Sequence, residues 1–285
     1  SYANAETTDL WSALAKASSQ PVEEIMESWL NQTGYPYLKV SVDRGVEETV
    51  VTAIQNKFLY DNIVQPNETD ETLWHVPLSV RAADSSAQST LVKQRRGQLT
   101  LHSSMPRWVK VNRDQTGFYR VQYEESEISR LATAVEKLTL PAIDRLGLQN
   151  DAYSLAKGGH IPATQFLKIA QSYMNEDNAY VWIDLATNLA GLDNLLSDEP
   201  FFDSFQRFAR KLFLPSAERM GWEAAPTDEH LDTLMRSSVL AGAGNYGDTD
   251  TLKKASHLFT TYPQGVHADI RRVVLSLAAQ SGDRS

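Results

Sequence analysis

The sequence predicts a multidomain protein, β then α: a small β-sandwich followed by a solenoid-like array of α-helical hairpins. Between residues 37 and 124, apolar residues alternate with polar ones, which is typical of half-buried strands. After residue 124, apolar residues recur every three or four positions, which is typical of amphipathic helices. Two helical stripes precede the strands. We therefore predict three parts, residues 1–36, 37–124 and 125–285, and expect the last to be incomplete at its C-terminal end.

The first part is predicted to contain two helices within residues 9–30. Leu10 and Leu14 share one helical face, and Asp9 is a candidate N-cap. Pro21 suits the first turn of the second helix. A glycine and a proline, Gly34 and Pro36, end that helix.

The second part is predicted to be a small β-sandwich of short strands. Leu38, Val40 and Val42 alternate with polar residues, so they are expected to face a core. Pro77 places its strand at a sheet edge or a bulge. Further strands are predicted at residues 50–59, 74–80, 98–101, 108–111 and 118–123.

One dense basic cluster lies within this second part. Lys93, Arg95 and Arg96 come just before Gly97, where a hairpin turn is expected. A solvated turn explains such a cluster better than an anion site does.

The third part is predicted to be entirely helical. Short loops between amphipathic helices are typical of antiparallel hairpins and solenoids, although no clean repeat period is visible. The predicted helices cover residues 128–138, 144–156, 162–173, 177–192, 200–214, 228–241, 249–260 and 267–280.

Composition excludes several classes of protein and site. The net charge is −9, with 27 basic and 36 acidic residues, so nucleic-acid binding is disfavoured. The chain has no cysteine, which excludes disulfides, thiolate zinc sites and cysteine nucleophiles. No apolar run approaches the about 20 residues that span a bilayer.

The location that the sequence favours is the cytoplasm. The N-terminal residues carry neither a basic start nor an apolar core, so they do not resemble a signal peptide. Two glycosylation-type triplets, at residues 31–33 and 67–69, would matter only in a secreted protein. A secreted or luminal location stays open.

Known catalytic motifs are absent or poorly placed. Residues 242–247, GAGNYG, match a dinucleotide fingerprint literally, but they follow a helical stripe rather than a strand, so we predict a helix C-cap and a loop before Asp248. No two histidines are spaced as in H-E-x-x-H, and there is no G-x-S-x-G elbow. We therefore predict no catalytic residue and no metal ligand in this chain.

Several stretches nevertheless resemble the zinc aminopeptidases of the aminopeptidase N and puromycin-sensitive class, the gluzincins. The resemblance spans nearly the whole chain in order, and the most specific stretches are W-x-x-Q-x-G-Y-P and N-x-x-x-x-G-F-Y-R-V. They occur at residues 26–40 (MESWLNQTGYPYLKV), 74–78 (WHVPL) and 112–123 (NRDQTGFYRVQY), with shorter ones at 9–11, 55–58, 144–146, 151–152, 176–182, 221–222 and 234–236. Lys57 stands where that class commonly has arginine.

The resemblance implies which part of such an enzyme this chain corresponds to. Family members carry the G-x-M-E-N motif, the H-E-x-x-H zinc helix, a glutamate ligand and a catalytic tyrosine upstream of the stretch that resembles Asp9. The chain would then hold two helices left from the catalytic domain, the sandwich and part of the helical domain. Zinc and peptide substrates are implied for the full-length enzyme, together with a missing N-terminal catalytic domain as partner. The chain alone is predicted to be inactive.

The resemblance also suggests two candidate substrate-channel residues. Residues 176–193 are similar to a helical-domain stretch that faces the bound peptide in some relatives. Trp182 and Asp193 are the candidates; the alternative is an ordinary helix-packing tryptophan and a surface aspartate.

The competing function is a non-enzymatic module whose concave helical face binds peptides or a partner protein. If the chain is part of an aminopeptidase, Trp11, Met26 and Trp29 would form an exposed apolar patch, or dock onto the sandwich or another copy.

Overall fold

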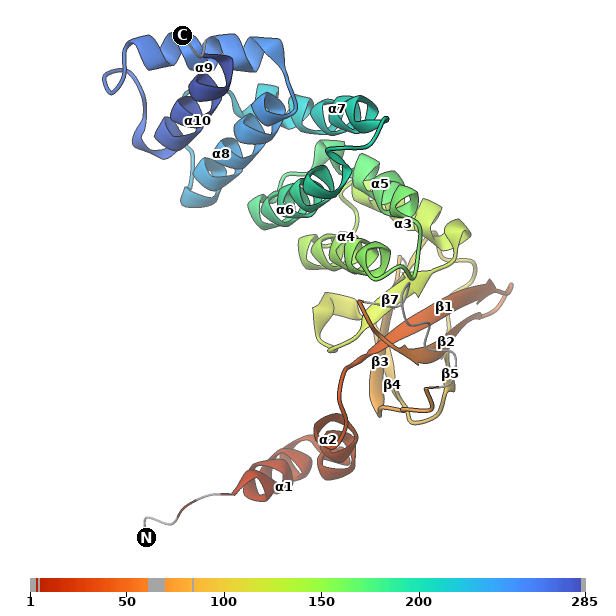
Figure 1. Ribbon diagram of the computed structural model, residues 1–285. Helices are drawn as coiled ribbons and strands as arrows, with labels where there is room; N and C mark the ends of the chain where they lie inside the picture. The colour runs from red at the N-terminus through yellow and green to blue at the C-terminus, as the bar shows by residue number, and fades with distance from the viewer. Residues whose placement is uncertain (1–3, 5, 61–69, 84, 283–285) are drawn as a thin grey trace. The chain divides into compact units, whose positions relative to one another are not determined.

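The computed structural model describes residue 4 and residues 6–60, 70–83 and 85–282; the triplet at 67–69 lies outside them. The chain, drawn in Figure 1, divides into two compact units. The first comprises Ser1–Leu131 and Asp151–Gln165, and the second Ala132–Asn150 and Phe166–Ser285. The predicted order of a sandwich followed by a helical array is confirmed.

The first unit begins with two helices, α1 (Thr7–Ser18) and α2 (Val22–Leu30). The N-cap of α1 is Glu6 rather than Asp9: Asp9 is the third helical residue, and its carboxylate accepts a hydrogen bond of 2.9 Å from the Glu6 amide. This arrangement is a capping box. Asp9 therefore stabilises the helix start from inside the first turn.

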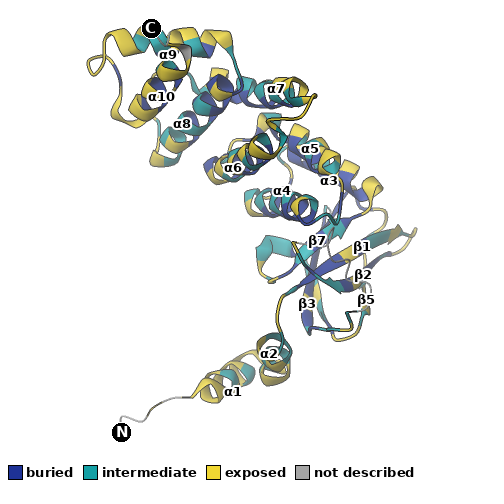
Figure 2. Cartoon of the chain, in the orientation of Figure 1, coloured by how far each residue is buried: buried dark blue, intermediate teal, exposed yellow. Residues whose placement is uncertain are grey.

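Neither helix contains a buried residue, as the colours of Figure 2 show. Trp11, Met26 and Trp29 are each half-buried. Trp29 docks onto the sandwich: its Nε1 donates to the His75 carbonyl at 3.0 Å, and its ring centroid lies 6.2 Å from that of Trp74. Of the predicted alternatives for these three residues, docking onto the sandwich is the one observed for Trp29.

Two sheets form the sandwich. The strand order is β5-β2-β1-β7 in one sheet and β4-β3-β6 in the other. All neighbours are antiparallel except β1 and β7, which pair in parallel. The strands are β1 (Pro36–Arg44), β2 (Thr49–Lys57), β3 (Val76–Ala82), β4 (Gln88–Val92), β5 (Arg96–Leu101), β6 (Val109–Val111) and β7 (Arg120–Tyr123).

Alternation along the strands builds the core between these sheets. Leu38, Val51, Leu78 and Leu101 are fully buried, whereas Lys39 between two buried neighbours is exposed. Facing rows of apolar side chains from two sheets are what a sandwich requires.

Two details of the sandwich differ from expectation. β4 and β5 lie in different sheets, so Lys93 and Arg95 occupy a crossing between sheets and not a hairpin turn. Lys93 pairs with Glu24 at 2.8 Å, and Arg95 donates to two backbone carbonyls. Pro77 lies in the middle strand of its sheet, but β6 pairs only with Val80 to Ala82, so Pro77 has a strand on one side only.

The segment before β7 is organised by Asn112. Its backbone is left-handed, with φ of 57°, and its buried side-chain amide accepts from the Gly117 amide at 2.8 Å and donates to the Gly117 carbonyl at 2.9 Å. Gly117 itself does not need a positive φ. A Cβ there would lie 2.2 Å from the Tyr119 ring, so glycine is required for close approach.

A buried charge cluster secures β7. The Asp151 carboxylate accepts from the Val121 amide at 3.1 Å and from Arg120 at 3.2 Å. Lys110 is also fully buried, and its Nζ donates to two backbone carbonyls. Burial raises the pKa of Asp151 to about 6, although Lys110 and Arg120 favour its charged form.

The remaining elements are helical. α3 (Glu125–Glu136), α4 (Ala142–Lys157) and α5 (Ala163–Ala170) are divided between the two units. In the second unit, α7 packs against α8, α9 against α10, and α8 also contacts α6 and α10. The further elements are η2 (Gln171–Asn175), α6 (Ala179–Leu196), α7 (Phe202–Met220), α8 (His230–Asn245), α9 (Thr249–Thr260), η3 (Ala268–Ile270) and α10 (Arg271–Ser281).

Three helices extend four or more residues beyond their predicted ends, and α6 is one of them, because it ends at Leu196 and not at residue 192. α7 continues through Pro215 to Met220, and α8 includes Gly242 and Gly244, which were predicted to cap a helix and form a loop. The loop begins only at Tyr246, and Asp248 caps α9 by accepting from the Thr251 amide at 2.9 Å, as expected.

Among the described residues, no helix is both long and apolar enough to cross a membrane.

Candidate functional site

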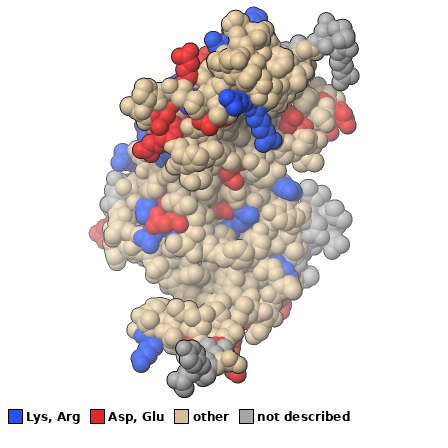
Figure 3. Space-filling view, turned by 90° about the vertical axis from the view of Figure 1, so that its left-hand side faces the viewer, with Lys and Arg blue, Asp and Glu red and all other residues tan. Residues whose placement is uncertain are grey.

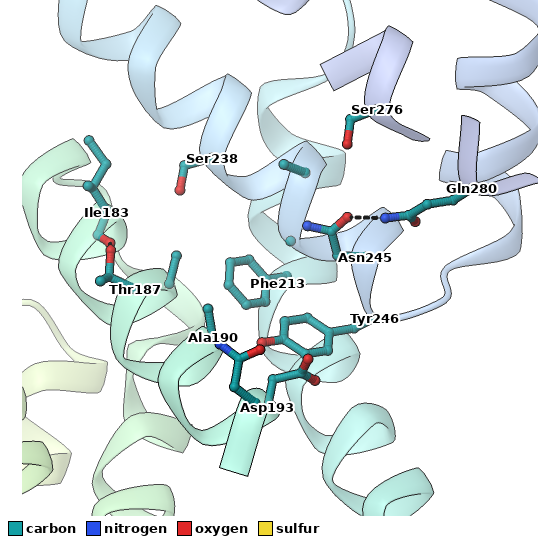
Figure 4. Close-up of a pocket in the computed structure, with 14 residues that line it drawn as sticks. Ile183, Thr187, Ala190, Asp193, Phe213, Ser238, Asn245, Tyr246, Ser276 and Gln280 are labelled. Atoms are coloured by element: carbon teal, nitrogen blue, oxygen red, sulfur yellow. Dashed lines mark hydrogen bonds between the residues drawn. The ribbon is translucent and has the colours of Figure 1, made fainter. Parts of the chain in front are cut away.

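A groove on the second unit is the best candidate for a binding site. Its volume is about 670 Å³, and it lies among helices α6, α7, α8 and α10 (Figure 4). The lining residues are Ile183, Ala186, Thr187, Ala190, Asp193, Asn194, Phe213, Ser238, Ala241, Gly242, Asn245, Tyr246, Ser276 and Gln280.

Helical spacing places small residues along the groove walls. On α6, Ala186, Thr187 and Ala190 recur at helical intervals, and on α8, Ser238, Ala241 and Gly242 do the same. Short side chains on facing helices leave space between them that larger side chains would fill. The groove therefore follows from the sequence of these two helices.

The floor of the groove is aromatic. Phe213 of α7 is fully buried, and its ring stacks on Tyr246, with centroids 5.7 Å apart. Gly242 is required here, because a Cβ on it would lie 2.3 Å from the Phe213 ring. Alanine at this position would force the ring out of its place.

Polar groups form the rim. Asp193 comes from the last turn of α6, and Asn245 from the end of α8 accepts a hydrogen bond of 2.8 Å from Gln280 of α10 (Figure 4). The Asp193 carboxylate lies beside the Tyr246 side chain (Figure 4). Burial raises the pKa of the Asp193 carboxyl, and burial together with the nearby Asp193 charge raises the pKa of Tyr246.

The two candidate channel residues lie in different environments. Asp193 is half-buried and lines the groove. Trp182 is fully buried; its Nε1 donates to the Glu176 carbonyl at 3.0 Å, and its ring lies 5.1 Å from that of Phe213. Trp182 thus lies next to the groove floor and does not line the groove. Contact of either side chain with a peptide stays a prediction.

The N-terminal end of α6 is held by a buried ion pair. Arg145 donates to both oxygens of Glu176, at 2.8 and 2.7 Å, and Glu176 also accepts from the Asn178 amide at 2.9 Å. Glu176 is fully buried and Arg145 nearly so. This cluster explains why an acidic residue precedes α6. The role of that residue is to stabilise the fold.

The groove itself was not predicted from the sequence. The available signal was the run of alanine, serine and glycine at helical intervals in α8, but residues 242–247 were interpreted as a loop. Small residues that face one another across helices become visible only when the helix pairing is known.

The described residues do not fit a zinc ion. Among them, no group of three histidine, cysteine, aspartate or glutamate side chains could hold a metal.

On the face drawn in Figure 3, basic side chains are scattered among acidic and uncharged ones and do not form a continuous strip.

Known proteins are similar to this chain over nearly its whole length. Residues 108–285 match the sequence profile of the ERAP1-like C-terminal domain. The chain is 30% identical to the puromycin-sensitive aminopeptidase of Caenorhabditis elegans and 31% identical to aminopeptidase 2 of Candida albicans, over 99% of its length in both cases. It is 30% identical to human glutamyl aminopeptidase over 93% of its length.

These matches cover only part of each relative. The chain spans 30%, 31% and 28% of the length of these three proteins, respectively. The predicted resemblance to the aminopeptidase class is confirmed.

Proposed function

The chain belongs to the family of ERAP1-like C-terminal domains, and from this membership we propose that it is the non-catalytic C-terminal part of a zinc-dependent aminopeptidase. The complete enzyme would remove residues from the N-terminus of peptides. The observation that carries this proposal is the match to aminopeptidases over 99% of the chain but about a third of their length. Zinc and the catalytic residues would belong to the remainder of the enzyme, and the chain has no H-E-x-x-H sequence.

Within such an enzyme, each part of the chain has a proposed role. Residues 1–36 would complete the catalytic domain, residues 37–124 would form the sandwich domain, and residues 125–285 would form the helical domain. The helical domain would cover the active site and shape the chamber for the peptide. The groove lined by Asp193 supports this role, because it offers a hollow surface with an aromatic floor and a polar rim.

Helix α1 supports the proposed packing against a catalytic part. Leu10 and Leu14 are four residues apart, so they lie on one face of the helix. Their exposed fractions are 53% and 43%, which is high for leucine side chains. A catalytic part packed on this face would remove that apolar surface from water.

An activity assay on the purified chain tests the non-catalytic assignment. We expect no hydrolysis of an aminoacyl-p-nitroanilide above the buffer rate, with or without added zinc. Hydrolysis that a chelator abolishes would contradict the assignment, because it would require a catalytic metal site within these residues.

The coding sequence upstream of Ser1 distinguishes the two candidate functions. An H-E-x-x-H segment ahead of Ser1 is expected if the chain belongs to an aminopeptidase. The alternative, a non-enzymatic peptide- or protein-binding module, is favoured only by the groove being complete within one unit. A native start close to Ser1 would support that module and contradict the aminopeptidase assignment.

A further inference from the structure

The groove of the second unit has one charged lining residue, Asp193. The other lining residues are small, apolar, aromatic or neutral polar, and none is basic. A ligand in this groove would therefore meet a single negative charge and no positive one. That charge distribution favours a cationic ligand.

The Asp193 carboxylate also has no hydrogen-bond donor or cation paired with it in the described part of the chain. It is partly removed from water, and a desolvated charge without a partner is unfavourable. A cation that enters the groove would supply the missing partner.

The position of Asp193 in its helix is unfavourable for a second reason. It lies three residues before the end of the described helix α6, whose last residue is Leu196. The helix dipole places partial negative charge at that end, so a carboxylate there is repelled. No basic residue in the last turn of α6 offsets this repulsion. Natural proteins depart from such local preferences mainly at functional sites.

The rest of the groove defines what kind of cation fits. Ala190 and Ala186 lie one and two helical turns before Asp193 on α6 and give an accessible apolar surface beside the carboxylate, which suits an aliphatic stem. Tyr246 lies beside the carboxylate, whereas Asn245 and Gln280 lie farther along the groove and are bonded to each other (Figure 4). A divalent metal would need several oxygen ligands, whereas the lining offers one carboxylate.

We propose that this groove binds a lysine or arginine side chain of a peptide, with the charged head at Asp193 and the aliphatic stem along Ala186 and Ala190 of α6. In the context of the proposed aminopeptidase function, on which this assignment of a peptide rests, the groove would favour substrates with a basic residue in the part that reaches the helical domain.

Binding of matched peptides to the intact chain tests this proposal. The probes are two octapeptides of glycine and serine that differ at one central position, lysine in one and norleucine in the other. Norleucine keeps the aliphatic stem and lacks the ammonium group. Affinity is measured from amide chemical shifts of the ¹⁵N-labelled chain, which also locate the bound peptide.

We expect the lysine peptide to bind about tenfold more tightly than the norleucine peptide, since a charge-assisted hydrogen bond would be lost. The shifts should map to the last turn of α6 and to Tyr246. In Asp193→Asn the two peptides should bind alike, which isolates the interaction between the carboxylate and the ammonium group. The control is Asp198→Asn, which removes an exposed carboxylate that does not line the groove and should leave the tenfold difference intact.

Several results would overturn the proposal. These are equal affinity of the two peptides for the unmodified chain, no binding of either peptide, shifts that map away from the groove, or a tenfold preference that survives Asp193→Asn. A free diamine such as cadaverine that binds as tightly as the lysine peptide would overturn the assignment of a peptide as ligand.

The outcome is separable from that of the proposed function. Peptide binding is measured on this chain alone, whereas the aminopeptidase assignment depends on the upstream coding sequence. A lysine preference without an upstream H-E-x-x-H segment would keep the cation site and reject the enzyme. The segment without the preference would do the reverse.

Discussion

The carboxylates at the two ends of helix α6 lie in opposite environments. Just before the helix, Glu176 is fully buried, bonded to Arg145 through both oxygens, and placed where the helix dipole favours negative charge. In the last turn, Asp193 is half-buried, has no partner among the described residues, and meets the unfavourable end of the dipole. The difference distinguishes a carboxylate that stabilises the fold from one that costs stability and is available to a ligand.

The largest expected effect comes from removing the stabilising carboxylate. Glu176→Gln should lower the free energy of unfolding by about 3–5 kcal/mol, because Arg145 would keep its charge in a buried site with only the exposed Asp177 carboxylate as its counter-charge. Urea denaturation measures the loss. The control is Asp177→Asn, since Asp177 pairs with the same arginine but its side chain is 63% exposed; it should cost less than about 1 kcal/mol. Equal losses would mean that burial does not decide the contribution of these pairs.

A third carboxylate, Asp151 in the first unit, extends the comparison to pH. Burial raises its pKa to about 6 from an ordinary 3.8, so between these values the folded chain holds a proton that the unfolded chain has released. This group therefore contributes stability below pH 4 that is lost as the pH rises through 6, a difference of up to about 3 kcal/mol.

Asp151→Asn should remove this contribution from the pH profile. Urea denaturation of both proteins at a series of pH values between 4 and 7 gives the two profiles, and the difference between their slopes isolates the carboxyl. The variant should also be less stable at pH 7, where Arg120 and Lys110 lose a counter-charge. Parallel profiles would show that the carboxyl has an ordinary pKa in the folded state.

A smaller effect is expected from the groove floor. Gly242→Ala should reduce stability by up to about 2 kcal/mol, because overlap with Phe213 costs about 1–3 kcal/mol while alanine improves helix propensity by about 1 kcal/mol. Thermal or urea denaturation measures the net change. Combining it with Phe213→Leu should give a total loss below the sum of the two, since the smaller side chain relieves the overlap. A simple gain in stability from the alanine would refute the close approach.

The smallest effect has the opposite sign. Asp193→Asn should raise the free energy of unfolding by about 0.3–1 kcal/mol, because a negative charge is removed from the end of the helix where the dipole repels it. Asp203→Asn is the matched control: Asp203 lies in the first turn of α7, where the dipole favours it, so its loss should destabilise by a similar amount. Destabilisation of the chain by both substitutions would contradict the prediction that the Asp193 charge costs stability, and it would not support a functional Asp193.

The sequence was a good guide to the fold where periodicity carried the information. The alternation around Leu38 and the stripes of the helical part predicted both the sandwich and the array. Strand β4 was missed, because Gln88, Ser89 and Thr90 are polar and show no alternation of apolar residues. α7 was predicted to end at Leu214, yet it continues past Pro215, with Ser216 and Ala217 buried against the core.

The candidate site was less predictable, for a physical reason. Glycine usually indicates a turn, but Gly242 and Gly244 lie within α8, because Phe213 and Leu277 occupy the space where their Cβ atoms would be. Only the packing of α7 and α10 against α8 shows why glycine is needed. Asp193 was selected through resemblance to relatives, and its lack of a partner could be recognised only from the arrangement of helices around it.

The small residues of the groove walls suggest how new selectivity could arise. Thr187 and Ala190 on α6 and Ser276 on α10 are exposed to the groove and belong to no packed core. Exchange of any one for a larger or charged side chain would alter the shape of the hollow at little cost to folding. A lineage carrying this scaffold could therefore explore new ligands one substitution at a time, while the buried residues beneath stay unchanged.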